Sequence, residues 1–234
     1  MLFIASLFIS IVQAQNIPRT DSNAANIPVA PNLPVAIFSP PSVTIVNDPV
    51  LPFYNQTWMQ KNLNVTTYRN GDPITQVTDA AAWAVLTTGA WCWYNNDPAN
   101  GKIYGKLYNW YAVNDPRKLA PEGWHIPTDA EWTDLVTCLY GELVAGGNMK
   151  ALGRTIWAAP NFGATNSSGF SGLPGGYRGN DGAFGTVGND GRWWSSTEID
   201  MTFAWSRHLY NWNRQIGRND SYKLQGFSVR CIRD

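Results

Sequence analysis

The chain has 234 residues, and its 17 Lys and Arg residues balance its 17 Asp and Glu residues, so the formal net charge is zero. Only 15% of the residues are charged and no basic stripe is present, which removes the electrostatic basis for binding nucleic acid or an anionic membrane surface. Twelve Trp and ten Tyr residues beside 21 Gly residues are typical of a loop-rich extracellular domain with an aromatic core.

Residues 2–13 form an apolar run, and a small-x-small pattern follows with Val12 and Ala14 as its small residues. The run is too short to span a bilayer, and no stop-transfer sequence follows it. We therefore expect a secretory leader over residues 1–14 and a chain that is secreted or displayed on the cell surface, with no membrane span. The alternative is an apolar N-terminal strand that is retained.

Residues 15–52 form a Pro-rich arm with eight of the fifteen prolines, little charge and no helical period. Within it, residues 35–38 and 42–46 are rich in strand-forming types. One interpretation is an extended stalk. The other is an arm that adds a strand to a sheet edge of its own domain or of a neighbouring copy. The residues of this assembly strand are Val43, Thr44, Ile45 and Val46.

A folded domain is expected from about residue 53 to residue 234. Its first half predicts strands at 56–59 and 62–68, a turn at 70–73, a short helix at 79–86 and an aromatic strand at 90–94. A turn at 95–98 and an apolar, aromatic segment at 106–113 follow.

A helix over residues 129–140 is the clearest element of the sequence. Thr128 and Glu131 form a capping box, in which each side chain bonds the backbone amide of the other residue. Gly141 supplies the stop. The apolar positions recur at helical spacing and predict a buried stripe of Trp132, Leu135, Val136 and Leu139.

The second half of the domain predicts a short helix at 143–152, a long Gly, Asn and Ser region at 153–192, and strands at 193–198, 204–210 and 226–232. Together these elements indicate an α+β fold with one or two helices, small antiparallel sheets and long loops.

Three cysteines in an exported chain allow one disulfide and leave one thiol. Cys138 lies on the predicted helix and Cys231 in the closing strand, so we pair these two. Cys92, between two tryptophans, is then expected to be a buried free thiol, because no His, Lys or Arg is near it in sequence to activate it.

Seven segments closely resemble, in order, the Fibrobacter succinogenes major paralogous domain, a family of exported bacterial proteins. They cover residues 56–234 and read QTWMQKNLNVTTYRNGDPI, WCWYNND, YGKLYNWYAVND, PEGWHIPTDAEW, GFSGLPGGYR, WWSSTE and GFSVRCIRD. One departure is Ala120 before Pro121, where family members often have Cys-Pro.

That family looks distantly related to the C-type-lectin-like fold, including formylglycine-generating enzymes. The resemblance implies a compact α+β domain whose termini meet, with two helices and a long irregular loop region. It also supports the pairing of Cys138 with Cys231, because lectin-like folds join their first helix to their last strand. The copper-binding cysteine pair of the formylglycine-generating enzymes is not matched, since only Cys231 lies near the C-terminus.

A calcium site is one interpretation of a repeated Gly-Asn-Asp-Gly sequence, because calcium prefers hard oxygen ligands from flexible loops. The sugar-binding motifs of calcium-dependent lectins are absent, and Asn-Asp-Gly is first of all a turn sequence. We therefore expect turns, no obligatory cofactor, and calcium as the alternative. The candidate ligands are Asn180, Asp181, Asn189 and Asp190.

Enzymatic readings are weaker. His125 and His208 are the only histidines, too few for a zinc cluster, and no nucleophile-elbow motif is present. Glu198 with Asp190 or Asp200 could form the paired carboxylates of a glycosidase, but no further motif supports this. We therefore expect no enzymatic activity.

Aromatic rings together with Asn and Arg on loops are suited to binding glycans or proteins. The candidate binding residues are Tyr177, Arg178, Arg192, Trp194, Trp212, Asn213 and Arg214. Four sequons offer glycosylation sites if the host glycosylates, at Asn55, Asn64, Asn166 and Asn219.

Three functions remain after these exclusions. The first is a secreted, non-enzymatic surface or structural protein that self-associates through its arm, into filaments if the contact does not close. The second is a monomeric glycan- or protein-binding module with the arm as a stalk. The third, and least favoured, is an enzyme of the formylglycine-generating or glycosidase type.

Overall fold

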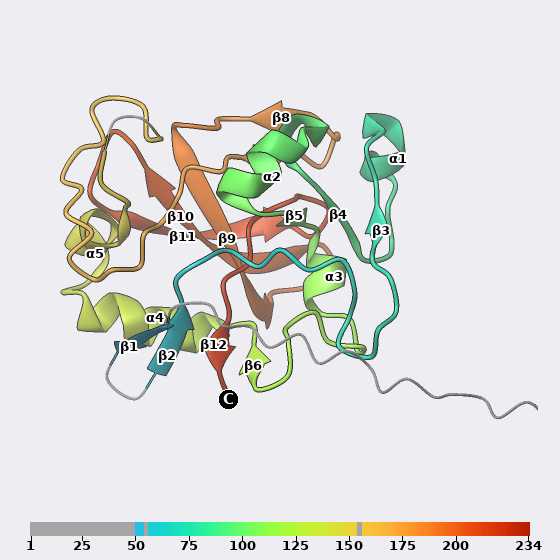
Figure 1. Ribbon diagram of the computed structural model, residues 1–234, viewed down its shortest axis with the longest axis horizontal. Coiled ribbons are helices and arrows are strands. Elements are labelled where there is room, and N and C mark those ends of the chain that lie inside the picture. Colours follow the sequence, from blue (N-terminus) through green and yellow to red (C-terminus); the bar gives the residue numbers. More distant parts are fainter. Residues whose placement is uncertain (1–49, 54–55, 154–155) are drawn as a thin grey trace, which may run out of the picture. The chain divides into compact units, whose positions relative to one another are not determined.

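The computed structural model describes residues 50–53, 56–153 and 156–234 (Figure 1). All of them belong to one of the two compact units of the chain, residues 41–234. The predicted leader, the assembly strand at 43–46 and the sequon at Asn55 lie outside the described residues.

The two helices that the sequence predicts at 129–140 and 143–152 are both present in the structure. The capping box of Thr128 and Glu131 is confirmed: Glu131 N donates to Thr128 Oγ1 at 3.2 Å, and Thr128 N donates to Glu131 Oε2 at 2.8 Å. The helix that begins at Asp129 ends at Cys138 and is shorter than expected, because Tyr140 and Gly141 adopt positive φ angles of 73° and 86°. The helices are α1 (Ala80–Ala84), α2 (Pro98–Tyr104), α3 (Trp110–Val113), α4 (Asp129–Cys138) and α5 (Glu142–Met149), with a 3-10 turn η1 (Tyr94–Asn96).

A four-stranded sheet joins the two ends of the described domain. Its order is β1 (Val50–Phe53), β2 (Gln56–Met59), β12 (Ile232–Arg233) and β6 (Trp124–His125). Trp58 of β2 pairs with Ile232 of β12, and Ile232 also pairs with His125. The last strand, β12, therefore lies between β2 and β6, which brings the two ends of the described domain together as the family resemblance implied, and β1 and β6 are the two outer strands.

A three-stranded antiparallel meander forms the centre of the fold (Figure 1). It consists of β9 (Asp190–Glu198), β10 (Phe203–Tyr210) and β11 (Ile216–Tyr222), with β10 in the middle. Two smaller sheets lie beside it. They are β3 (Thr75–Gln76), β4 (Ala90–Cys92) and β5 (Leu107–Tyr108), and the hairpin β7 (Tyr177–Arg178) and β8 (Phe184–Gly185).

Both faces of the meander are covered by apolar side chains. Because neighbouring residues of a strand point to opposite faces, Trp193 and Trp194 belong to different cores. Trp193 packs with Phe170 and the buried stripe of α4, whereas Trp194 stacks on Phe227, with 4.4 Å between ring centroids. The α+β class with small sheets is confirmed, and the core is aromatic on both sides.

Several local predictions need correction. Residues 62–68 form no strand but an irregular segment bonded to distant backbone, with Leu63 N donating to Val229 O at 2.8 Å. The turn predicted at 95–98 is present in part, since residues 95–96 belong to the 3-10 turn η1, but Asp97 caps α2 and Pro98 occupies its first turn. The sheets are not all antiparallel, since β3 pairs with β4 in parallel.

The pairing of Cys138 with Cys231 is also wrong, because all three cysteines are free. Cys231 precedes Ile232, which pairs with His125 just before the start of α4. Cys138 is the last residue of this ten-residue helix, which is about 15 Å long. The two cysteines therefore lie near opposite ends of α4. A disulfide needs Cα atoms within about 7 Å of each other, so this separation does not allow the predicted bond.

Candidate functional site

An ion-pair cluster fixes the first turn of α4 to the meander. The Asp129 carboxylate accepts hydrogen bonds from Arg207 Nη1 at 2.6 Å and from Arg218 Nη2 at 2.8 Å. Arg207 is 2% exposed and also donates to Asp129 O and Thr133 Oγ1. Burial opposes the charge of Asp129, but the bonds from Arg218 and Arg207 outweigh it and lower its pKa. One carboxylate thus holds two guanidinium groups.

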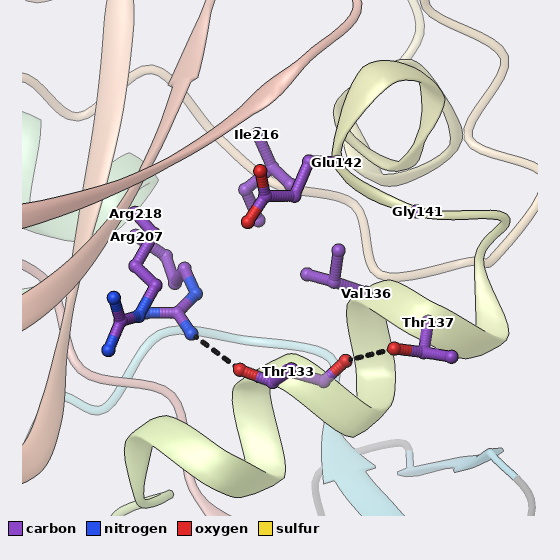
Figure 2. Close-up of a pocket in the computed structure, with 8 residues that line it drawn as sticks. All are labelled: Thr133, Val136, Thr137, Gly141, Glu142, Arg207, Ile216 and Arg218. Atoms are coloured by element: carbon purple, nitrogen blue, oxygen red, sulfur yellow. Dashed lines mark hydrogen bonds between the residues drawn. The ribbon is translucent and has the colours of Figure 1, made fainter.

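A cavity of about 140 Å³ lies beside this cluster, between α4, the start of α5 and the meander (Figure 2). Figure 2 shows Arg207 and Arg218 on one side, Glu142 opposite them and Thr133 below. The guanidinium groups of Arg207 and Arg218 line the cavity, and both already form hydrogen bonds with Asp129. Their bonding is therefore satisfied by the protein itself. We assign the cavity to the ion-pair cluster rather than to a ligand.

A larger groove, of about 400 Å³, is bordered by β6 and by the start of α4. Its floor is apolar and its rim is polar, which is the usual anatomy of a binding site. The buried floor residues are Val113, Leu119, Ala120, Trp124 and Ile126. Polar residues that line it include Arg69, Asn114, Lys118, His125, Thr128 and Asp234.

His125 lies at this groove between two carboxylates. Its Nε2 is 2.9 Å from Glu131 Oε1, and its Nδ1 is 2.8 Å from Asp234 Oδ1. Burial disfavours the charged ring, but the two hydrogen bonds outweigh that effect and raise the pKa of His125. Protonated His125 therefore ties the last residue of the sequence to the first turn of α4.

Ser206, His208 and Tyr210 form a polar row on one face of β10. Ser206 Oγ is 2.9 Å from His208 Nε2, and the Tyr210 hydroxyl is 3.2 Å from His208 Nδ1. The geometry resembles a nucleophile and its base, but Ser206 is fully buried and burial lowers the pKa of His208 to about 3. A substrate has no access to this pair, which we interpret as a buried hydrogen-bond network.

Two of the predicted binding residues are structural. Trp194 has no exposed surface, and its Nε1 donates to Tyr108 O at 2.8 Å. Arg178 is 1% exposed, and it donates to four backbone carbonyls, among them Val77 O at 2.6 Å. The expectation of a binding face around these side chains is wrong, because each is surrounded by protein that the linear sequence places far away.

The remaining predicted binding residues fall into two groups. Arg192 lies over the ring of Tyr177, with 3.8 Å from Cζ to the ring centroid, and it pairs with Asp190. The second group, Trp212, Asn213 and Arg214, forms the turn between β10 and β11. There Trp212 is 64% exposed.

The two Gly-Asn-Asp-Gly copies have different roles. The first is the turn of the β7–β8 hairpin, where Asp181 Oδ1 accepts from Ala183 N at 3.0 Å. The second opens β9, and its Asp190 bonds Thr186 and Arg192. Asn189 O accepts from Asn211 N, and Asn180 lies in the first turn. Within the described ranges, no group of three or more His, Cys, Asp and Glu side chains is arranged to hold a metal ion.

The described sequon asparagines all have side-chain or backbone contacts. Asn64 Oδ1 accepts from Lys106 Nζ at 2.6 Å, and Asn166 Nδ2 donates to Ser171 Oγ at 2.9 Å. Asn219 lies on β11, where its backbone oxygen accepts from Ser206 Oγ.

Sequence reasoning missed the residues that organise these sites. Arg207 and Arg218 lie on β10 and β11, with no motif that marks them. The only local signal is Asp129 in the first turn of α4, where a negative charge is also favourable to the helix dipole and so does not by itself indicate an ion pair.

Comparison with known proteins gives one match. The model of the Fibrobacter succinogenes major domain matches residues 54–233, and no curated protein and no solved structure matches the chain. Among the described residues, no helix has the length and apolar character needed to cross a bilayer. The chain belongs to the Fibrobacter succinogenes major domain family.

Proposed function

We propose that this chain is an extracellular, non-enzymatic protein in which a C-type-lectin-like domain self-associates through the N-terminal arm. The adjacent strands β2 and β12, the two consecutive helices α4 and α5 and the long loop region after α5 support the lectin-like fold. The inaccessible Ser206 supports a non-enzymatic role.

One observation carries the proposal of self-association: β1, at the C-terminal end of the arm, and the groove lie at opposite edges of one sheet. Residues 50–52, the last of the arm, belong to β1, one outer strand of the four-stranded sheet. The groove borders β6, the other outer strand. An outer strand has unpaired backbone groups on one side, which is where a further strand adds.

The arm segment and the groove also match in chemistry. Residues 43–46 are uncharged and all β-branched, a composition that suits a strand laid against an apolar floor such as that of Val113, Leu119 and Ile126. In the proposed contact, residues 43–46 of one copy add beside β6 of the next. Such a contact is head-to-tail, and one that does not close into a ring produces a filament.

The test compares the secreted full chain with a variant lacking residues 15–49, by light scattering and electron microscopy. The proposal predicts large oligomers or filaments for the full chain and monomers for the deletion. The substitution Ile45→Pro should act like the deletion, because it removes a backbone donor from the strand. Ala30→Pro, in the already Pro-rich part of the arm, is the matched control and should still assemble. Monomers in every form would overturn the proposal.

A second candidate function is a monomeric binding module with the arm as a stalk. The specific observation that favours it is the exposed ring of Trp212 on the β10–β11 turn. The size measurement separates the two candidates, since this module stays monomeric with and without the arm.

A further inference from the structure

The turn between β10 and β11 presents an aromatic side chain to solvent. Trp212 is 64% exposed, and its ring lies 5.4 Å from that of Tyr210, at an interplanar angle of 33°. Tyr210 in turn contacts His208, whose ring packs on Phe227 of the core. A row of rings therefore connects the exposed indole to the interior of the domain.

A buried lysine fixes the backbone on both sides of this indole. Lys150 has no exposed surface, and its ammonium group donates to Tyr210 O at 2.9 Å, Asn213 O at 2.7 Å and Phe162 O at 2.8 Å. Burying a cation is costly unless its donors are satisfied, so these three carbonyls must keep their positions. Lys150 Nζ thus holds the backbone on both sides of Trp212, at Tyr210 and at Asn213.

Helix α5 and a neighbouring loop hold the rest of the turn. Gly147 N donates to Arg214 O at 2.9 Å, and Phe162 N donates to Asn211 O at 2.7 Å. A side chain at Gly146 would collide with the turn, since an added Cβ would lie within 2.0 Å of Gln215 O. The exposed ring consequently belongs to a rigid turn and not to a loose loop.

Polar groups on the same turn remain available for a ligand. Arg214 is exposed, and its guanidinium group has no hydrogen-bond or ion-pair partner among the described residues. The aliphatic part of the Arg214 side chain lies against Gly163, and this contact helps to position the side chain. Asn213 uses its Oδ1 to accept from Gln215 N, and its amide group has no partner within the described part of the chain.

We propose that the Trp212 turn, Asn211 to Gln215, is a carbohydrate-binding site that favours acidic sugars. A pyranose ring has an apolar C–H face that covers a flat aromatic side chain, and its hydroxyl groups project sideways toward hydrogen-bond donors. Trp212 supplies the flat ring, Asn213 supplies amide donors, and Arg214 supplies a bidentate donor for a sugar carboxylate. A fixed aromatic group binds a small rigid ligand at low entropic cost.

The carbohydrate site rests on the second candidate function, the monomeric binding module, and gives the class of its ligand. It does not depend on the arm, so a failure to bind sugars would leave the assembly test unaffected. The probes are a trigalacturonate and the neutral trisaccharide maltotriose, titrated into the full chain by calorimetry. We expect trigalacturonate to bind more tightly than maltotriose. Trp212→Ala should weaken both by about tenfold or more, equivalent to about 1.4 kcal/mol.

Two further variants separate the roles of ring and charge. Arg214→Gln should remove the preference for trigalacturonate and leave maltotriose binding unchanged. Met201→Ala removes an apolar side chain that is 91% exposed on another turn, and it should bind both sugars as the unmodified chain does. The inference is overturned if neither sugar binds the unmodified chain, if Trp212→Ala binds as tightly, or if Met201→Ala loses binding equally.

Discussion

Arg207 Nη1 lies 2.6 Å from Asp129 Oδ1, and this contact joins the middle strand of the meander to the first residue of α4. The capping box starts the helix, whereas the Arg207 contact determines where the helix lies. The stability of the domain should therefore depend on one carboxylate more than on any other surface charge of α4.

Asp129→Asn should lower the free energy of unfolding by about 3 kcal/mol, because it leaves the buried Arg207 without its counter-charge. Urea denaturation at neutral pH measures this change. Asp134→Asn is the matched control: it removes an exposed carboxylate from the same helix and should change stability by less than about 0.5 kcal/mol. Equal effects of the two substitutions would contradict the role of the cluster.

The Asp129 carboxylate should also make the stability of the domain fall at low pH. The pKa of Asp129 is lowered in the folded state, so its contribution is fully present above its unfolded pKa of about 4. That contribution is lost as the pH falls through the lower folded value. The stability of Asp129→Asn should consequently depend less on pH below about 4 than that of the unmodified chain.

His125 has the opposite pH dependence. Its folded pKa is raised, so its contacts with Glu131 and Asp234 stabilise the fold fully below its unfolded pKa of about 6.5. That stabilisation is lost as the pH rises through the folded pKa. The difference in unfolding free energy between the unmodified chain and His125→Gln should be largest near pH 5.5 and should shrink above neutrality. A difference that grows with pH would refute this assignment.

The folded chain should react with iodoacetamide at one cysteine. Burial raises the pKa of Cys92 and of Cys231 to about 12, which leaves almost no thiolate at pH 8. Cys138 is only half-buried. Mass spectrometry should find Cys138 labelled in the native chain and all three cysteines labelled after unfolding without reductant. Two cysteines that resist labelling after unfolding would reveal a disulfide.

Lys150→Met should destabilise the domain by about 3 kcal/mol, because three buried carbonyls lose their donor. Hydrogen exchange should also become faster at the amides of the β10–β11 turn. The control is Lys118→Met, an exposed lysine at the groove, which should leave both quantities unchanged. Unaltered exchange in the turn would contradict the fixing role of Lys150.

Local features were predictable from the sequence. The capping box, the stripe of α4 and the caps of short helices depend on residues within one or two turns, and the structure confirms them at Thr128 and Glu131. The family was also recognisable, since its motifs cover the chain from residue 54 to residue 233.

Features that depend on distant residues were not predictable. Trp193 and Trp194 look like one inward and one outward ring, and both are buried because the meander is covered on each face. Arg178 and Lys150 look like surface cations, but backbone carbonyls from other loops surround them. The groove likewise combines segments that are remote in sequence, from residue 69 to residue 234.

Cross-linking between two differently substituted chains tests the proposed assembly most directly. One chain carries Thr44→Cys and the other Asn114→Cys at the groove, both with Cys138→Ser, and they are mixed and treated with a short bismaleimide. The control pair replaces Asn114→Cys by Leu143→Cys, an exposed position beyond the far end of α4. The account predicts a covalent dimer of the two chains with Asn114→Cys and little with Leu143→Cys. No such dimer, or equal yields from both pairs, would contradict it.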